Sequence, residues 1–260
     1  MTTPSDPGEN LTSSPFDAVA FAYDETFGGW PAARFFRFRL IDSISRRVKH
    51  GSRLLDIGSG SGEDAVWLAS LGYQVLGIDP SSGMVEVARA KAARAHVGAE
   101  FRPQAFETFI SDESFDAVYS DFGAMNCVPL EAWVGPLSRL VRPGGSVFFV
   151  LMGQKPAPEF LLTGRTAWRR RLAAVAPVDA GRSIRVNYPD PGAIENALGP
   201  MFQVERTETF GLLVPPPGTA NWPRRNPIAF GLLAALEAVV SNRRQLCRFS
   251  DHYLIELTRR

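Results

Sequence analysis

A glycine-rich turn after an apolar stretch limits what this chain can fold into more than any other feature. The run Leu-Leu-Asp-Ile-Gly-Ser-Gly-Ser-Gly, which starts at Leu54, has glycines at three alternate positions: Gly58, Gly60 and Gly62. Glycine lets the backbone turn sharply and come close to a ligand, because no Cβ stands in the way. A second apolar run ends at Asp79, 23 residues after Asp56, where a carboxylate can accept hydrogen bonds from two ribose hydroxyls. Together the two features predict a site for a nucleoside-bearing cofactor.

The composition is that of a chain that can bury a sizeable core. It has 260 residues, of which 45% are hydrophobic and 21% charged, so one or at most two domains are expected. We find no N-terminal signal pattern and no apolar run of the roughly 20 residues needed to span a bilayer. The cysteines Cys127 and Cys247 lie far apart and form no metal-type spacing, so no metal site is predicted. These observations predict a cytoplasmic protein.

Strand and helix patterns alternate along most of the chain, which predicts a parallel sheet covered on both faces. Residues 1–14 are mostly polar and rich in Thr, Ser and Pro, which predicts a disordered tail. Residues 15–50 have a helical pattern and are expected to form an N-terminal cap before the main domain at 51–260. Strands are predicted at 53–57, 74–78, 99–102, 115–119, 146–152, 202–209 and 252–257.

Two basic segments are predicted as insertions around the last strands. Residues 153–187 carry seven basic residues against two acidic ones, and residues 211–250 carry five arginines against one glutamate. Both also contain aromatic residues, such as Trp168 and Trp222. Loops at the mouth of a sheet commonly carry specificity, so the two insertions are expected to form a substrate lid.

Several motifs in order resemble the class I S-adenosylmethionine (SAM)-dependent methyltransferases, particularly the bacterial small-molecule group. The resemblance covers residues 50–152 and begins with the acidic residue and alternate glycines described above. It continues with Phe-Asp-Ala-Val-Tyr-Ser at 115–120 and with Leu-Val-Arg-Pro-Gly-Gly at 140–145. Where family members usually have Gly-Asp-Ala, this chain has Pro-Gln-Ala-Phe at 103–106, which is a departure from the family pattern.

The resemblance implies an α/β fold with a Rossmann-like, doubly wound sheet of seven strands, the last of them antiparallel and inserted between its neighbours. It implies SAM as the cofactor and a small molecule as the acceptor. The basic and aromatic insertions suggest an apolar or aromatic acceptor with an anionic group. The residues expected to hold the cofactor are Tyr23, Asp56, Gly58, Ser59, Gly60, Gly62, Asp79, Pro80, Met84, Gln104, Ala105, Phe106, Ser120 and Phe122.

Three residues are candidates for a general base or for orienting the acceptor: His252, Asp121 and Asn126. The carboxyl ends of parallel strands line the crevice of such a sheet, and this places Asp121 and Asn126 there. The last strand runs the opposite way, so its start brings His252 to the same mouth. Each prediction has a structural alternative: His252 as a packing residue at a strand start, and Tyr23 as an ordinary aromatic in helix packing.

Other functions stay open from the sequence alone. The segment Gly-Ser-Gly-Glu-Asp-Ala, which starts at Gly60, also fits the looser dinucleotide pattern of an NAD(P)-dependent oxidoreductase. Against this stand the acid two residues before the first glycine and the lack of a Tyr-x-x-x-Lys proton relay. A SAM-binding protein without catalysis, or a scaffold that binds partners, is also consistent with the motifs.

The basic insertions allow more than one interpretation. The helix predicted over 226–240, followed by Arg243 and Arg244, is one candidate for peripheral contact with an anionic membrane. Nucleic acid is not expected as a partner, because Ser-Asp-Phe-Gly at 120–123 matches neither signature that is common in RNA enzymes of this fold. A solvated basic face is the remaining alternative. The sequence indicates no oligomeric state.

Overall fold

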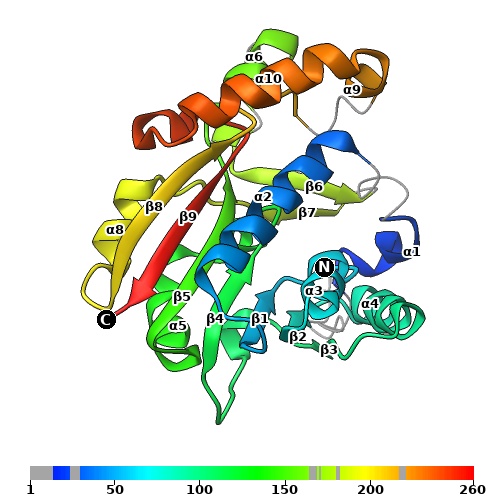
Figure 1. The fold of residues 1–260 in the computed structure, drawn as a ribbon, viewed down its shortest axis with the longest axis vertical. Coiled ribbons are helices and arrows are strands. Elements are labelled where there is room, and N and C mark those ends of the chain that lie inside the picture. Colours follow the sequence, from blue (N-terminus) through cyan, green and yellow to red (C-terminus); the bar gives the residue numbers. More distant parts are fainter. Residues whose placement is uncertain (1–13, 24–29, 164–168, 170, 180–181, 217–220) are drawn as a thin grey trace, which may run out of the picture.

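The structure is built on a sheet of mostly parallel strands with one antiparallel strand next to its edge (Figure 1). The computed structural model describes residues 14–23, 30–163, 169, 171–179, 182–216 and 221–260. Within these residues the main sheet has seven strands in the order β3-β2-β1-β4-β5-β9-β8. Their bounds are Arg53–Ile57 (β1), Gln74–Asp79 (β2), Glu100–Pro103 (β3), Phe115–Ser120 (β4), Val141–Met152 (β5), Phe202–Phe210 (β8) and His252–Arg259 (β9).

The strand directions confirm the predicted topology. β1 pairs in parallel with β2 and β4, and β4 pairs in parallel with β5, so their carboxyl ends share one edge of the sheet. β9 is antiparallel to both of its neighbours, β5 and β8. Met152 at the end of β5 pairs with His252 at the start of β9. The start of the last strand therefore lies at the same edge as the carboxyl ends of the parallel strands.

Helices cover both faces of the sheet, because each presents apolar side chains to it. One buried cluster contains Phe36 from α2, Leu68 from α3 and Ala88 from α4. The cluster on the other face contains Trp133, whose ring lies edge-on to Phe149 at 5.4 Å between centroids. The helices of the first face are α2 (Pro31–Arg47), α3 (Glu63–Ser70) and α4 (Ser82–Ala95), and those of the second are α5 (Val134–Leu140) and α8 (Pro191–Leu198).

The N-terminal segment is held against the start of α4. A 3₁₀ turn at Asp17–Val19 leads into α1 (Ala20–Tyr23), and α1 contacts α4. The Asp17 carboxylate accepts hydrogen bonds from Ser81 Oγ at 2.5 Å and from the Gly83 backbone N–H at 3.1 Å. This segment therefore packs beside the end of β2. Of the tail predicted at 1–14, only Ser14 lies within the described residues.

Both predicted insertions gather at the edge formed by the carboxyl ends of the parallel strands (Figure 1). The first contains α6 (Ala157–Thr163) and a two-stranded antiparallel sheet of β6 (Val175–Asp179) and β7 (Arg182–Arg185), which the sequence patterns did not predict. The second contains α9 (Asn221–Arg225), α10 (Pro227–Val240) and a 3₁₀ segment at Arg244–Phe249. Among the described helices, none combines the length and apolar character that crossing a membrane requires.

Candidate active site

The glycine-rich turn connects β1 to α3 and is fixed by β2. The backbone N–H groups of Gly58 and Ser59 both donate to the carbonyl of Ile78, at 2.8 and 3.0 Å. Gly60 has φ +50°, and a Cβ built on it has no atom within 4 Å. A Cβ built on Gly58 lies 2.2 Å from the Cβ of Ala124. Gly58 is therefore needed for packing, whereas Gly60 leaves an open approach to the backbone, as a bound ligand requires.

Asp79 ends β2 and reaches across to the glycine turn. Its Oδ2 accepts a hydrogen bond from the Gly60 N–H at 2.9 Å, and its Oδ1 accepts one from the Ser81 N–H at 2.8 Å. Burial raises the pKa of Asp79 above its ordinary value, and these two N–H groups act against that rise. The carboxylate is oriented by backbone groups and keeps lone pairs for two further donors, as the predicted contact with a ribose requires.

The residues predicted to contact the adenine lie around the same strand end. Asp79 is paired with Pro103 across β2 and β3, and the Gln104 N–H donates to the Asp79 carbonyl at 2.9 Å. The Gln104 side-chain amide donates to the Thr108 carbonyl at 3.2 Å. The four others differ in exposure, with Met84 and Phe106 buried, Ala105 half-buried and Pro80 exposed.

A cluster of buried carboxyl groups lies beside the glycine turn, at Asp56, Asp64 and Asp121. Arg37 from α2 reaches this cluster, and its Nε donates to Asp64 Oδ1 at 2.5 Å. Burial raises the pKa of Asp56 well above its ordinary value, and the Asp64 carboxyl adds to the rise. Burial and Asp64 likewise raise the pKa of Asp121, while Arg37 lowers it. Arg37 interacts with Asp64 and Asp121, so the three carboxyl groups outnumber the guanidinium, and this position favours an additional cation.

Buried polar atoms without a hydrogen-bond partner gather at the same place. Among the described residues, they include Asp56 Oδ2, Ser59 Oγ, Ser120 Oγ and Asp121 Oδ2. Buried polar atoms in native proteins normally have hydrogen-bond partners. The group of unpartnered atoms at the ends of β1 and β4 therefore indicates a binding site for a polar ligand. Together with the open approach to Gly60, it fits a cationic ligand that carries hydroxyl groups.

Phe122 and His252 lie together at the edge formed by the carboxyl ends of the parallel strands. Phe122 follows β4 with φ +48°, a backbone conformation that is costly for a bulky residue and that commonly marks functional sites. The ring of His252 lies edge-on to Phe122, with 5.8 Å between centroids. The guanidinium carbon of Arg37 lies 5.3 Å from the centroid of the Phe122 ring. The structure thus brings His252 from β9 to the loop after β4, where the carboxyl cluster ends.

His252 contacts the Asp251 carboxylate, which in turn contacts the Arg171 guanidinium. Asp251 Oδ2 lies 2.9 Å from His252 Nδ1, and Asp251 Oδ1 lies 2.5 Å from Arg171 Nη2. Burial alone would raise the pKa of Asp251, but His252 and Arg171 outweigh it and lower this pKa to about 2. Because an ionised carboxylate can only accept hydrogen bonds, Nδ1 of His252 carries the proton of this contact. In the neutral imidazole, Nε2 is then the nitrogen with a free lone pair.

The remaining predicted residues differ in what surrounds them. Asn126 is fully buried, and its side-chain amide accepts from the Met152 N–H at 2.9 Å and donates to the Asn187 carbonyl at 2.6 Å. Asn126 therefore ties the loop after β4 to the end of β5 and to the first insertion. Tyr23 is half-buried at the end of α1, next to residues that lie outside the described part of the chain.

Sequence reasoning did not single out Asp64, Asp251 or Arg171. Asp64 follows the glycine run by two residues, and Asp251 directly precedes the candidate base, so an acidic residue beside each motif was an available signal. Arg171 had no such signal, because its contact with Asp251 joins residues 80 positions apart.

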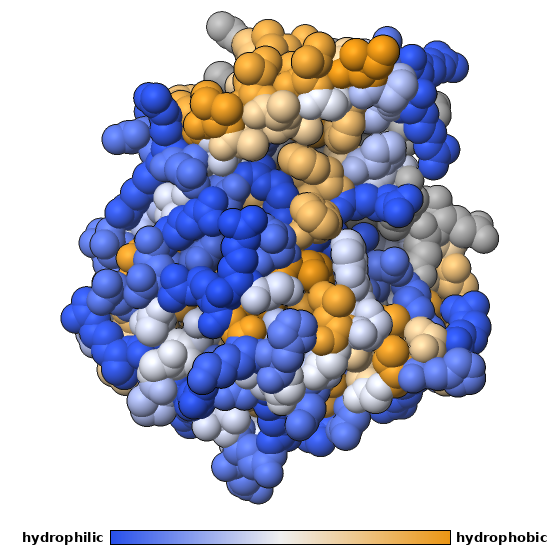
Figure 2. Space-filling model, in the orientation of Figure 1, coloured by the Kyte–Doolittle hydropathy of each residue, from blue (hydrophilic) through white to orange (hydrophobic). Residues whose placement is uncertain are grey.

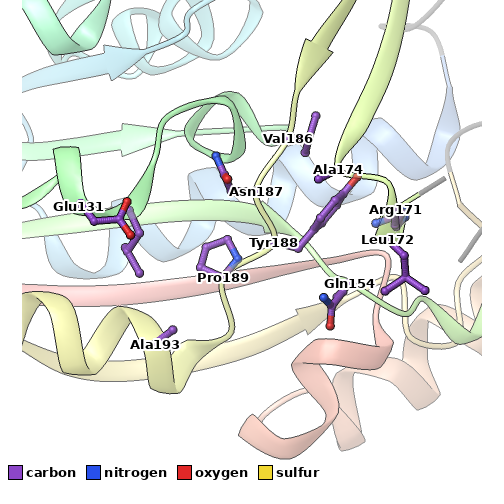
Figure 3. A pocket seen from close by; sticks show the side chains of 11 residues that line it. Glu131, Gln154, Arg171, Leu172, Ala174, Val186, Asn187, Tyr188, Pro189 and Ala193 are labelled. Atoms are coloured by element: carbon purple, nitrogen blue, oxygen red, sulfur yellow. The ribbon is translucent and has the colours of Figure 1, made fainter. Parts of the chain in front are cut away.

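A cavity of about 330 Å³ lies beside the first insertion (Figure 3). Its lining includes Glu131, Gln154, Arg171 and Tyr188, and the described lining residues include none of those predicted for the cofactor. The cavity thus lies apart from the residues predicted to hold the cofactor. Arg171 links the two places, because the guanidinium that lines the cavity also holds Asp251.

Comparison with known proteins places this geometry in a family. Residues 55–149 match the model of a methyltransferase domain. Over 171 residues, the chain is 30% identical to a demethylmenaquinone methyltransferase of Clavibacter sepedonicus, covering 66% of this chain and 67% of that protein. Over 118 residues, it is 34% identical to a ubiquinone biosynthesis O-methyltransferase of Mesorhizobium japonicum, covering 45% of this chain and 46% of that protein. The chain thus spans about half the length of that second relative.

Solved structures agree on the fold. A SAM-dependent methyltransferase from Mesorhizobium loti superposes with a TM-score of 0.56 at 21% identity, covering 86% of this chain and 97% of that one. A phosphoethanolamine N-methyltransferase from Haemonchus contortus, solved with SAM, gives a TM-score of 0.59 at 20% identity, covering 94% of this chain and 56% of that one. The matching methyltransferase domain and the curated relatives favour SAM over the NAD(P) cofactor that the glycine turn alone also allowed. The chain belongs to the class I SAM-dependent methyltransferases, and SAM is its cofactor.

Proposed function

We propose that this protein transfers the methyl group of SAM to a hydroxyl group on an aromatic small molecule, with His252 as the general base. The observation that carries the proposal is the pair Asp251–His252, 2.9 Å apart at the carboxyl edge of the parallel strands, with the His252 ring edge-on to Phe122. A base is needed only for an acceptor that must lose a proton, so a buried, oriented imidazole at this position favours a protonated acceptor.

The residues that would hold the cofactor lie at the ends of the four neighbouring strands β3, β2, β1 and β4 and in helices α1 and α4. When bound, SAM supplies a methyl group on a positively charged sulfur, which leaves as a neutral thioether. Asp79 would accept hydrogen bonds from the ribose, while Asp56 and Asp121 would balance the positive charge. Gly58, Ser59, Gly60 and Gly62 would lie along the cofactor. Pro80, Met84, Gln104, Ala105 and Phe106 would hold the adenine, and Tyr23, Ser120 and Phe122 would hold the methionine part.

The proton of the acceptor moves to His252. Nδ1–H is fixed on the Asp251 carboxylate, so Nε2 takes the hydroxyl proton and the acceptor oxygen keeps its electron pair for the methyl group. The Asp251 carboxylate, held ionised by Arg171, stabilises the imidazolium that results. A phenolic hydroxyl, with an ordinary pKa of about 10, suits such a base far better than an aliphatic alcohol does.

An aromatic acceptor fits the surroundings of the base. The ring centroid of Phe36 lies 5.7 Å from that of His252, and the ring centroid of Phe122 lies 5.8 Å from it. The names of both relatives concern quinones, whose reduced forms carry ring hydroxyls, and this supports the same acceptor class here. In the first insertion, Arg171 already pairs with Asp251 and Glu159. These ion pairs give no support to an anionic group on the acceptor, which stays a prediction from the sequence.

Methyl transfer to a panel of compounds tests the proposal. The purified protein is incubated with methyl-labelled SAM and with catechols, hydroquinones, aliphatic alcohols and amines of similar size. We expect labelled product from the aromatic hydroxyl compounds. Transfer to amines alone would contradict the acceptor assignment, and heat of SAM binding without any turnover would support a SAM-binding protein without catalysis.

A further inference from the structure

Helix α10 presents an apolar face that is exposed among the residues that the structure describes. Its fourteen residues include a single charged one, Glu237, and the exposed fractions of its outer side chains are large. They are 80% for Ile228, 62% for Leu232, 56% for Leu236 and 80% for Val239. These four residues, termed here the α10 face, recur every three or four positions and therefore share one side of the helix. Figure 2 shows apolar residues gathered at the end of the molecule where α10 lies.

The other side of α10 is firmly attached to the protein. Phe230 packs against Phe35 of α2, with 6.2 Å between ring centroids. Glu237 is fully buried, and its carboxylate accepts from four consecutive backbone N–H groups at 211–214, the shortest at 2.5 Å. A carboxylate in such a backbone nest fixes the rotation of the helix about its axis. The orientation of the α10 face toward solvent is therefore a built feature of the fold.

Basic residues stand at both ends of the α10 face. Arg224 and Arg225 precede the helix, and Arg243 and Arg244 follow it, all four of them exposed. Arg244 pairs with Glu195 at 2.6 Å. The only acidic residue of residues 221–250 is Glu237, which is buried, so nothing negative lies on the exposed side of this segment. An apolar stripe between cationic ends is the pattern of a helix that lies in the plane of an anionic membrane surface.

A second copy of the chain fits this face less well. In an antiparallel pairing of two such helices, the arginines at the start of one helix meet those at the end of the other. In a parallel pairing, each basic end meets its own copy. Both arrangements bring like charges together at the rim of the contact, which disfavours association.

We propose that the α10 face docks the protein on an anionic lipid bilayer, so that it takes its acceptor from the membrane. This inference rests on the proposed function. Helix α2 links the α10 face to the candidate base. Phe35 of α2 packs against Phe230 of α10, and the ring centroid of the adjacent Phe36 lies 5.7 Å from that of His252. An acceptor with an apolar tail then reaches the base from the membrane side.

Sedimentation with vesicles tests this docking on the full chain. Vesicles of phosphatidylcholine containing phosphatidylglycerol are expected to carry down the protein at low salt, and vesicles of phosphatidylcholine alone to carry down much less. Leu232→Gln with Leu236→Gln is expected to weaken binding by roughly tenfold or more. Arg225→Gln and Arg243→Gln are each expected to weaken it by about fivefold. The matched control is Ile110→Gln, since Ile110 is 77% exposed but lies in the loop after β3.

Three outcomes overturn the docking proposal. One is wild-type protein that does not bind anionic vesicles, and another is equal binding by the double leucine variant. The third is a concentration-dependent dimer in analytical ultracentrifugation that the same variant dissociates, which would assign the face to a second copy. The double leucine variant should still methylate a water-soluble phenol at the wild-type rate. Failure of the wild type in that assay would reject the proposed function and leave the vesicle result intact.

Discussion

Asp251 bridges His252 and Arg171, with Oδ2 2.9 Å from the imidazole Nδ1 and Oδ1 2.5 Å from the guanidinium. The three residues come from the start of β9 and from the first insertion, which is far away in the sequence. Arg171 also donates to the Gly153 carbonyl at 2.6 Å and pairs with Glu159 at 2.9 Å. The contact therefore attaches the insertion to the residue that we assign as the base.

The role of Asp251 as a positioning residue predicts a defect in turnover with normal cofactor binding. An Asp251→Asn variant keeps the shape of the site, but it removes the charge that fixes the imidazole tautomer. We expect kcat to fall by about 100-fold or more, while the Kd for SAM changes little. The comparison is His96→Asn, at an exposed histidine with φ +54°, a conformation that asparagine tolerates. An equal loss of SAM affinity in Asp251→Asn would indicate a general structural role instead.

The pKa of Asp251 predicts a defined acid sensitivity. Its pKa is lowered to about 2 in the folded protein from an ordinary value of 3.8. The stability that its ionised form contributes is therefore fully present above about pH 4 and is lost as the pH falls toward 2. Urea unfolding of the wild type and of Asp251→Asn, from pH 5 down to pH 3, should show a difference in unfolding free energy that shrinks with acid. A difference that stays constant over this range would contradict the assignment.

The glycine turn predicts that alanine substitutions at two glycines lower stability alike but differ in their effect on SAM binding. Gly60 and Gly144 both have positive φ, +50° and +73°, and neither would place a Cβ within 4 Å of another atom. Replacing either by alanine should lower the unfolding free energy by a similar amount, about 1 kcal/mol. Only Gly60→Ala should also weaken SAM binding, by roughly tenfold or more, because only there does the methyl group enter the ligand's path. Calorimetry and urea unfolding of both variants measure the two effects. Equal SAM affinities would contradict this role of Gly60.

The carboxyl cluster predicts that SAM binding releases protons. Burial raises the pKa values of Asp56 and Asp121 in the free protein, and a cation placed beside them lowers both values. Affinity for SAM should therefore increase with pH until both groups are ionised without ligand. Titration calorimetry in two buffers with different ionisation enthalpies measures the released protons. S-adenosylhomocysteine, which lacks the sulfonium charge, should release fewer, and identical proton release for both ligands would contradict this account.

The sequence predicted the framework well because that framework is set by local patterns. Strands such as Arg53–Ile57 and His252–Arg259 begin where predicted, since short segments rich in apolar residues between turns leave little choice. The pair β6 and β7 was not predicted, because β6 contains Pro177, which argues against a strand. β5 begins at Val141, five residues before its predicted start, because the Arg-Pro-Gly-Gly turn is included in the strand.

The candidate site was predictable only where its residues lie at the termini of strands. Asp79 and His252 lie at the expected edge, because strand direction alone decides that position. The supports behind them depend on long-range contacts, such as Arg37 with Asp64 and Arg171 with Asp251. Charge patterns along the chain do not show which arginine pairs with which acid. The sequence therefore predicted a basic surface for the first insertion, although Arg171 is largely buried and ion-paired.

The His252→Ala variant provides the most direct test of the central claim, that His252 removes a proton from an aromatic hydroxyl during methyl transfer. Single-turnover transfer from labelled SAM to the best phenolic acceptor is measured for the wild type and the variant, with SAM affinity measured in parallel. We predict unchanged SAM binding and a transfer rate lower by about 100-fold to 10,000-fold, the range that a general base contributes. Transfer by His252→Ala at the wild-type rate would contradict the claim.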